Sequence, residues 1–120
     1  MTLTRGIPLA VHGALEVIAA PLVMIAPFVL GFDAVTAAIA IAFGAVLMAT
    51  GLQMESPERV VSISALAAFD YLFAAAIATA GIGIGIATGE WAQTSFLVGL
   101  GAAQAALTAA TRFSAPAVPR

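Results

Sequence analysis

Three side chains that can gain or lose a proton lie within long apolar stretches of the sequence: His12, Glu16 and Asp70. His12 and Glu16 are four residues apart, which places them on the same face of a helix. Glu16 and Asp70 each lie about 10 residues into an apolar stretch, or about 15 Å along a helix, near the middle of a membrane. Two carboxylates and an imidazole at one level could bind a proton or a cation, because intramembrane relays are built from such groups.

The same residues also suit a purely structural role. Each carboxyl group can be protonated, or paired with a neighbour, and so join one helix to another. The candidate partners are His12, Tyr71, Ser62 and Ser64. The Tyr71 hydroxyl itself needs a partner at this depth, and Glu16 is a candidate. Interhelical polar contacts contribute only about 0.6 kcal/mol on average, so they specify packing more than they stabilise it. We favour the structural interpretation, and the proton or cation site is the alternative.

The composition indicates which elements must position these groups. The chain is 62% hydrophobic and 8% charged, with a mean hydropathy of +1.12, far from the roughly 25% charge of soluble domains. Crossing a bilayer core of about 30 Å takes about 20 apolar residues of helix. We therefore predict an all-α, four-helix transmembrane bundle, in which the first stretch is a membrane span and not a signal peptide. The predicted spans are residues 7–32, 34–53, 60–88 and 92–111.

The arginines predict the orientation of the bundle, because positive residues in short loops stay in the cytoplasm. Arg5 precedes the first span, Arg59 lies between the second and third, and Arg112 and Arg120 follow the fourth. Both termini should therefore be cytoplasmic. The expected location is a bacterial or archaeal cell membrane, with the lipid bilayer as surroundings.

Prolines and small residues predict how the spans bend and pack. Pro21 and Pro27 each remove a backbone donor from the first span and favour a kink. Small residues allow membrane helices to approach closely. The small residues that we expect at helix contacts are Gly81, Gly83, Gly85, Gly99 and Ala103. The alternating glycines do not form a dinucleotide-binding loop, since that loop follows a strand and opens a helix.

The two halves of the chain, about residues 1–54 and 55–120, resemble each other weakly. A shift of about 54 residues places Glu16 on Asp70 and Gly31 on Gly85. This pattern predicts two helical hairpins of the same orientation, related by an axis along the membrane normal. The alternative is a chance alignment of alanine-rich helices.

The segment Ala26-Pro27-Phe28-Val29-Leu30-Gly31-Phe32 resembles the Ser-Pro-Trp-Val-Leu-Gly-Phe signature of the SPW-repeat membrane proteins. Their units are pairs of transmembrane helices, and a polar residue about 11 positions before the proline is usual, as Glu16 is here. Ala26 and Phe28 replace the signature Ser and Trp, and Gly81-Ile82 stands where a second Pro-Trp would be expected. The resemblance implies a membrane fold and no particular activity.

Several function classes find no support in the sequence. There is no cysteine, and a net charge of -2 does not favour nucleic acid as a partner. The single histidine has no serine within helical reach in its own span, so we expect no enzyme. It could ligate a haem or chlorophyll, but no second ligand is evident, so we expect no cofactor. Apart from Glu55 and Glu58 in a loop, no carboxylates have metal-ligand spacing, and no metal site is expected.

We therefore expect a small integral membrane protein with a structural or accessory role and no catalytic activity. It would form a homo-oligomer or join other membrane subunits, because its helices offer many small-residue faces. The alternative is a small oligomeric transporter or channel that uses the intramembrane carboxylates for proton or cation binding.

Overall fold

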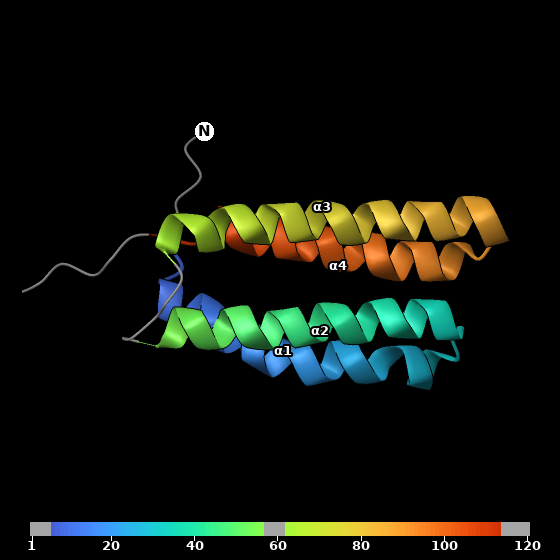
Figure 1. Ribbon diagram of the computed structural model, residues 1–120, viewed down its shortest axis with the longest axis horizontal. Coiled ribbons are helices and arrows are strands. Elements are labelled where there is room, and N and C mark those ends of the chain that lie inside the picture. The colour runs from blue at the N-terminus through green and yellow to red at the C-terminus, as the bar shows by residue number, and fades with distance from the viewer. Residues whose placement is uncertain (1–5, 57–61, 114–120) are drawn as a thin grey trace, which may run out of the picture.

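A computed structural model of the chain describes residues 6–56 and 62–113. These residues form four helices, and no β-strand occurs among them, in agreement with the all-α prediction. Consecutive helices lie along the bundle axis and run antiparallel to each other (Figure 1). The helices are α1 (Leu9–Leu30), α2 (Ala34–Glu55), α3 (Ile63–Thr88) and α4 (Trp91–Ala109).

Local signals in the sequence begin and end these helices. The Asp33 side chain accepts a hydrogen bond from the first turn of α2, and Ser62 does the same for α3. Gly31 and Gly89 end α1 and α3 with φ of 73° and 74°, a left-handed conformation that favours glycine. These caps produce the two tight turns that the polar breaks predicted.

The two prolines of α1 lie inside a single continuous helix. Pro21 and Pro27 are both within Leu9–Leu30, although each lacks the N–H that an interior helical residue donates. The Pro27 carbonyl accepts the backbone N–H of Phe32 at 2.9 Å, just beyond the end of the helix. Helix α1 therefore continues through both prolines without a break.

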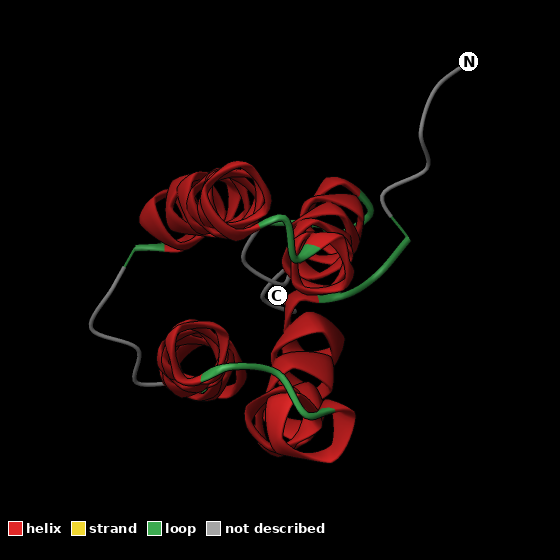
Figure 2. Cartoon of the chain, turned by 90° about the vertical axis from the view of Figure 1, so that its right-hand side faces the viewer, coloured by secondary structure: helices red, strands yellow, loops and turns green. Residues whose placement is uncertain are grey.

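The four helices pack as two hairpins, α1 with α2 and α3 with α4. Both tight turns lie at the same end of the bundle, on the right in Figure 1. Viewed end-on, the helices occupy the corners of a quadrilateral, with one hairpin above the other (Figure 2). Contact between the hairpins is sparser than contact within them. Groups that join one hairpin to the other are therefore important to the fold.

Close backbone approach within the first hairpin depends on glycine. A Cβ added to Gly13 would lie 2.6 Å from the Gly51 carbonyl oxygen, closer than real Cβ atoms come to any neighbour. Gly51 is the matching position on α2, where an added Cβ would lie 2.7 Å from the Gly13 carbonyl oxygen. The two helices therefore meet backbone to backbone at this crossing.

The second hairpin has equivalent close contacts at some of the expected positions. A Cβ on Gly81 would lie 2.8 Å from the Leu97 Cβ, and Gly85 faces Trp91 and Thr94. In contrast, nothing lies within 4 Å of the same position at Gly83 or Gly99. Ala103 is exposed on α4. The expected small residues thus divide into two that allow the hairpin to close and three that make no such close contact.

The distribution of side chains is the reverse of that in a water-soluble protein. Large apolar side chains of α1 point outward, with Leu22 66% and Val29 78% exposed. Polar residues lie inside instead, such as Gln104, which is 6% exposed. Helices α1, α2 and α3 are each long and apolar enough to cross a membrane. Helix α4, with 19 residues and a length of about 28 Å, is not among the helices that are apolar enough to cross a membrane. The structure therefore supports three of the four predicted spans.

Candidate functional site: a buried polar cluster between the hairpins

Polar side chains from all four helices meet near one end of the bundle. We call this group the polar cluster. His12, Glu16 and Asp70 are no more than 2% exposed, so the structure places the three ionisable groups together, as expected from their similar depth. The full cluster consists of His12, Glu16, Thr50, Asp70, Gln104, Thr108 and Thr111.

His12 lies at the centre of the cluster. Its Nε2 atom is 2.7 Å from Glu16 Oε2 and 3.1 Å from Asp70 Oδ2. On the other side of the ring, Nδ1 is 2.7 Å from Thr111 Oγ1. The Thr111 hydroxyl donates its own hydrogen to the Leu107 carbonyl at 2.6 Å. Nδ1 must therefore donate to Thr111, which directs Nε2 at both carboxylates.

Glu16 connects three helices through its two oxygens. Gln104 on α4 donates from Nε2 to Glu16 Oε2 at 2.8 Å. Thr50 on α2 lies with its hydroxyl 2.6 Å from Glu16 Oε1 and 2.9 Å from the Val46 carbonyl. The Glu16 carboxyl thus has a partner on each oxygen and is held in one orientation.

Asp70 brings α3 into the cluster, while its neighbour Tyr71 does not take part. The Thr108 hydroxyl approaches Asp70 Oδ2 at 3.5 Å, near the limit for a hydrogen bond. Tyr71 is 45% exposed, so its hydroxyl, which was a candidate partner for Glu16, lies outside the cluster. Adjacent helical residues point about 100° apart, and because Asp70 faces inward, Tyr71 faces outward.

The polar cluster lies nearer to one end of the helices than to their middle. Helices α1 and α3 begin at Leu9 and Ile63, later than the predicted spans. Glu16 and Asp70 therefore each lie seven residues, or about 10 Å, from the start of their helix. That distance is about a third of the thickness of a bilayer core. The cluster lies at the end of the bundle where α1 begins and α4 ends (Figure 1).

That end of the cluster is covered by the segments flanking the helices. The Phe113 ring packs edge-on against the His12 ring, with centroids 5.5 Å apart and planes at 71°. The Ile7 N–H donates to the Ala110 carbonyl at 3.1 Å, and the Arg112 N–H donates to the Ile7 carbonyl at 2.8 Å. These contacts hold the two ends of the described chain side by side over the imidazole.

A second polar contact joins the hairpins at the opposite end. Asp33 donates its backbone N–H to Gln93 Oε1 at 3.0 Å and accepts a hydrogen bond from Gln93 Nε2 at 3.1 Å. Hydrogen bonds from the Thr36 N–H and from Gln93 hold the pKa of the Asp33 carboxyl below its usual value. The hairpins are therefore joined by polar groups near both ends.

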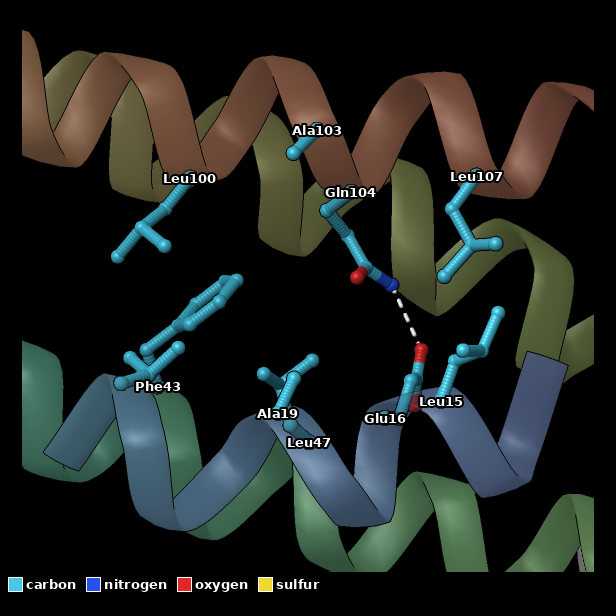
Figure 3. A pocket seen from close by; sticks show the side chains of 10 residues that line it. Leu15, Glu16, Ala19, Phe43, Leu47, Leu100, Ala103, Gln104 and Leu107 are labelled. Carbon is cyan, nitrogen blue, oxygen red and sulfur yellow. Dashed lines mark hydrogen bonds between the residues drawn. The ribbon is translucent and has the colours of Figure 1, made fainter.

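Between these two polar contacts lies a cavity of about 240 Å³. Figure 3 shows it between α1 and α4, with the hydrogen bond from Gln104 to Glu16 crossing one end. Its lining is otherwise apolar and includes Phe43, Leu47 and Leu100. The space beside Glu16 is thus left open on the cavity side and filled by protein on the others.

Sequence reasoning missed the cluster members that carry no charge. Thr50, Gln104, Thr108 and Thr111 all supply partners to the ionisable groups. Gln104 was a detectable signal, because an amide in an apolar span needs a partner for each of its polar atoms. Threonine gives no such signal, since its hydroxyl can bond its own helix backbone.

The cluster also has a geometry that the sequence spacing did not indicate. One ligand atom each from His12, Glu16 and Asp70 lies within 4.8 Å of the others, a grouping that could hold a metal ion. The sequence predicted no metal site, because that prediction depended on carboxylates that are close together along the chain. Here the third group comes from a different hairpin, 54 positions after Glu16.

Fold and site together define a class: a small all-α protein of two hairpins, with three helices long and apolar enough to cross a membrane and ionisable groups buried between them. No known protein family, curated protein or solved structure matches the chain.

Proposed function

We propose that this chain is a small integral membrane protein with a structural or accessory role, and that it has no catalytic activity. In this proposal the protein acts through its outer surface, as a homo-oligomer or as a subunit of a larger membrane complex. The polar cluster serves to hold the two hairpins in one arrangement, so that the surface has a defined shape.

The observation that carries the proposal is the pairing of the buried ionisable groups. His12, Glu16 and Asp70 contact one another, and the remaining positions of His12 and Glu16 are taken by amide or hydroxyl groups. A substrate or proton pathway needs at least one such group to be reachable. Pairing of this kind favours packing over transport, because it directs the polar groups at each other.

The accessory role can be tested in native membranes. We expect the protein, crosslinked there and then solubilised in a mild detergent, to be recovered as a defined homo-oligomer or in a fixed ratio with another membrane protein. Its mass, measured by native mass spectrometry, distinguishes the two cases. Recovery only as a single chain, with and without crosslinking, would contradict the proposal.

The structural part can be tested by stability. Glu16→Gln replaces a carboxyl oxygen of the His12 and Gln104 hydrogen bonds by an amide group while preserving the size of the side chain. We expect it to lower the free energy of unfolding, measured by denaturant titration in detergent micelles, by about 0.5–2 kcal/mol. Glu90→Gln is the matched control, because Glu90 is exposed at the other end and its side chain makes no capping bond. Equal stability of the two variants would argue against a structural role for the cluster.

One observation favours a second candidate, a small oligomeric transporter or channel. The cavity between α1 and α4 reaches Glu16, so this carboxyl is the ionisable group nearest to open space. Liposomes containing the protein and a pH-sensitive dye would test it. Under this alternative, proton or monovalent-cation flux is present with the wild type and is lost with Glu16→Gln. Under the structural proposal the two give the same flux.

A further inference from the structure

We propose that His12, Glu16 and Asp70 form a binding site for one divalent first-row transition-metal ion, of which Zn²⁺ is the best fit, and that the ion bridges the two hairpins. The site uses His12 Nε2 and Glu16 Oε2 from α1 and Asp70 Oδ2 from α3. This inference goes beyond the proposed accessory role and does not depend on it.

The ligand atoms are already near the separations that a metal ion requires. Zn²⁺ binds imidazole nitrogen and carboxylate oxygen at about 2.0–2.2 Å, and tetrahedral angles then set the ligand atoms about 3.3 Å apart. Nε2 lies 2.7 Å from Glu16 Oε2 and 3.1 Å from Asp70 Oδ2. Widening by about half an ångström would admit the ion, a movement within reach of side-chain rotation.

The hydrogen-bond pattern of His12 presents the correct nitrogen. Because Nδ1 donates to Thr111, a neutral ring has its hydrogen there and directs the Nε2 lone pair at the two carboxylates. Three electron-rich atoms that face one another need a positive centre among them, which a proton on Nε2 supplies in the metal-free protein and which a metal ion can supply by displacing that proton. A divalent ion supplies that centre, and with a neutral imidazole and two carboxylates it forms a site of zero net charge, which suits a low-dielectric interior.

The donor set selects among metals. One nitrogen and two carboxylate oxygens suit first-row transition ions such as Zn²⁺, whereas Ca²⁺ takes six to eight oxygen ligands and Mg²⁺ an octahedron of oxygens. Three protein ligands leave one position of a tetrahedron for water or an anion. The cavity that reaches Glu16 adjoins the site and leaves space on that side.

Each ligand also has the outer support that metal sites use. Thr111 holds the ring of His12, while Gln104 and Thr50 hold the carboxylate of Glu16. Such partners orient the ligands and fix the imidazole tautomer, and their loss lowers metal affinity about 10- to 100-fold. The Gln104 contact is visible in Figure 3, where the amide crosses the cavity to Glu16.

The test uses the full chain, purified without a histidine tag and freed of metal by a chelator. Zn²⁺ alone is titrated into the protein by calorimetry, and bound metal is counted by mass spectrometry. We expect one ion per chain. Co²⁺, added separately, should give the intense visible bands of a tetrahedral site, and Zn²⁺ should abolish them by displacement.

Three variants and one control locate the ion. Glu16→Gln and Asp70→Asn remove a ligand charge while preserving side-chain size, and each should weaken Zn²⁺ binding at least 10-fold. Thr111→Val should weaken it about 10- to 100-fold, since Thr111 only positions His12. The control Glu90→Gln removes a carboxylate from the opposite end and should bind as the wild type does.

X-ray absorption of the Zn²⁺-loaded wild type gives a readout that requires no variant to fold. One imidazole nitrogen together with oxygen ligands at about 2.0–2.2 Å is the expected shell. Absence of stoichiometric binding, a shell without imidazole, or binding unchanged in folded Asp70→Asn would each overturn the site. None of these results bears on oligomerisation, so the accessory role stands or fails separately.

Discussion

The Thr36 hydroxyl is the one buried side-chain polar group without a hydrogen-bond partner in the described part of the chain. Thr36 is 0% exposed, and burying a hydroxyl without a partner costs about 1–3 kcal/mol in mutational studies. Thr36→Val keeps the shape of the side chain and removes the hydroxyl. We expect the free energy of unfolding in detergent to stay equal or to rise by about 1 kcal/mol.

The corresponding control is Thr111→Val, which makes the same substitution at a threonine whose hydroxyl has hydrogen-bond partners. Thr111 accepts from His12 and donates to the Leu107 carbonyl, so this variant should be destabilised under the same conditions. Equal losses in the two variants would mean that the Thr36 hydroxyl has a partner in solution.

Individual residues could be predicted where charge made them conspicuous. His12, Glu16 and Asp70 were conspicuous because an ionisable group inside an apolar span is costly and so needs a role. Their similar distances from the starts of the spans predicted that they lie at one level. Their uncharged partners were not predicted, because a threonine such as Thr111 can bond its own helix and so carries no signal. The distance of 99 positions between His12 and Thr111 also prevented any inference from spacing.

At the scale of elements, two glycines in α3 offer a matched comparison. A Cβ at Gly81 would lie 2.8 Å from the Leu97 Cβ, whereas nothing lies within 4 Å of one at Gly83. We expect Gly81→Ala to destabilise the protein by about 1–3 kcal/mol through overpacking against α4. Gly83→Ala should be neutral or stabilising by up to about 1 kcal/mol, because alanine favours the helix. Unfolding in detergent followed by circular dichroism measures both, and the reverse order would be inconsistent with this packing.

The turn between α1 and α2 predicts a dependence on pH. The lowered pKa of Asp33 means that the ionised carboxyl is the form favoured by the fold. Its contribution to stability is therefore complete above the unfolded pKa of about 3.9 and is lost as the pH falls through the lower folded value. We expect unfolding measured between about pH 5 and pH 2.5 to show a smaller loss of stability in Asp33→Asn than in the wild type. An equal loss of stability in the wild type and in Asp33→Asn would mean that the Asp33 carboxylate makes no such contribution.

Helix boundaries were predictable to within a few residues, because the breaks contain polar and helix-ending residues. The predicted spans left gaps at residue 33 and at residues 89–91, and the structure places the two tight turns at residues 31–33 and 89–90. The repeat offset was less accurate. The sequence aligned Gly31 with Gly85, but the residue that ends α3 in the left-handed conformation is Gly89, one turn later. Glycine-rich helix ends do not indicate which glycine is the cap.

For the whole molecule, the orientation in the membrane is the main expectation still to be measured. Ile7 and Arg112 are hydrogen-bonded to each other, so both ends of the described chain share one face. We expect a reporter that is active only in the cytoplasm to be active when it is fused to either terminus. A cysteine introduced at Glu90, in a chain that has none, should react with an impermeant reagent from outside. Labelling of Glu90→Cys only after membrane disruption would indicate the opposite orientation.

The architecture could be predicted because hydropathy dominates the sequence, whereas the joining of the hairpins could not. The four helices follow from the four apolar stretches, and three of them are long and apolar enough to cross a membrane. The choice of neighbours depends on contacts such as Asp33 with Gln93 and Glu16 with Gln104, which form between residues far apart in the chain. The resemblance to SPW-repeat proteins remains a prediction, which the paired-helix arrangement does not test.

The bond between His12 and Thr111 has a consequence for biosynthesis. The ribosome synthesises the imidazole 99 positions before the hydroxyl that orients it. Until Gln104 and Thr111 have been made, His12 and Glu16 lack two of their hydrogen-bond partners, and we expect the first hairpin to stay beside the insertion machinery for that time. Truncated nascent chains ending before residue 104 should therefore stay bound to that machinery, and release into lipid should coincide with synthesis of the last helix.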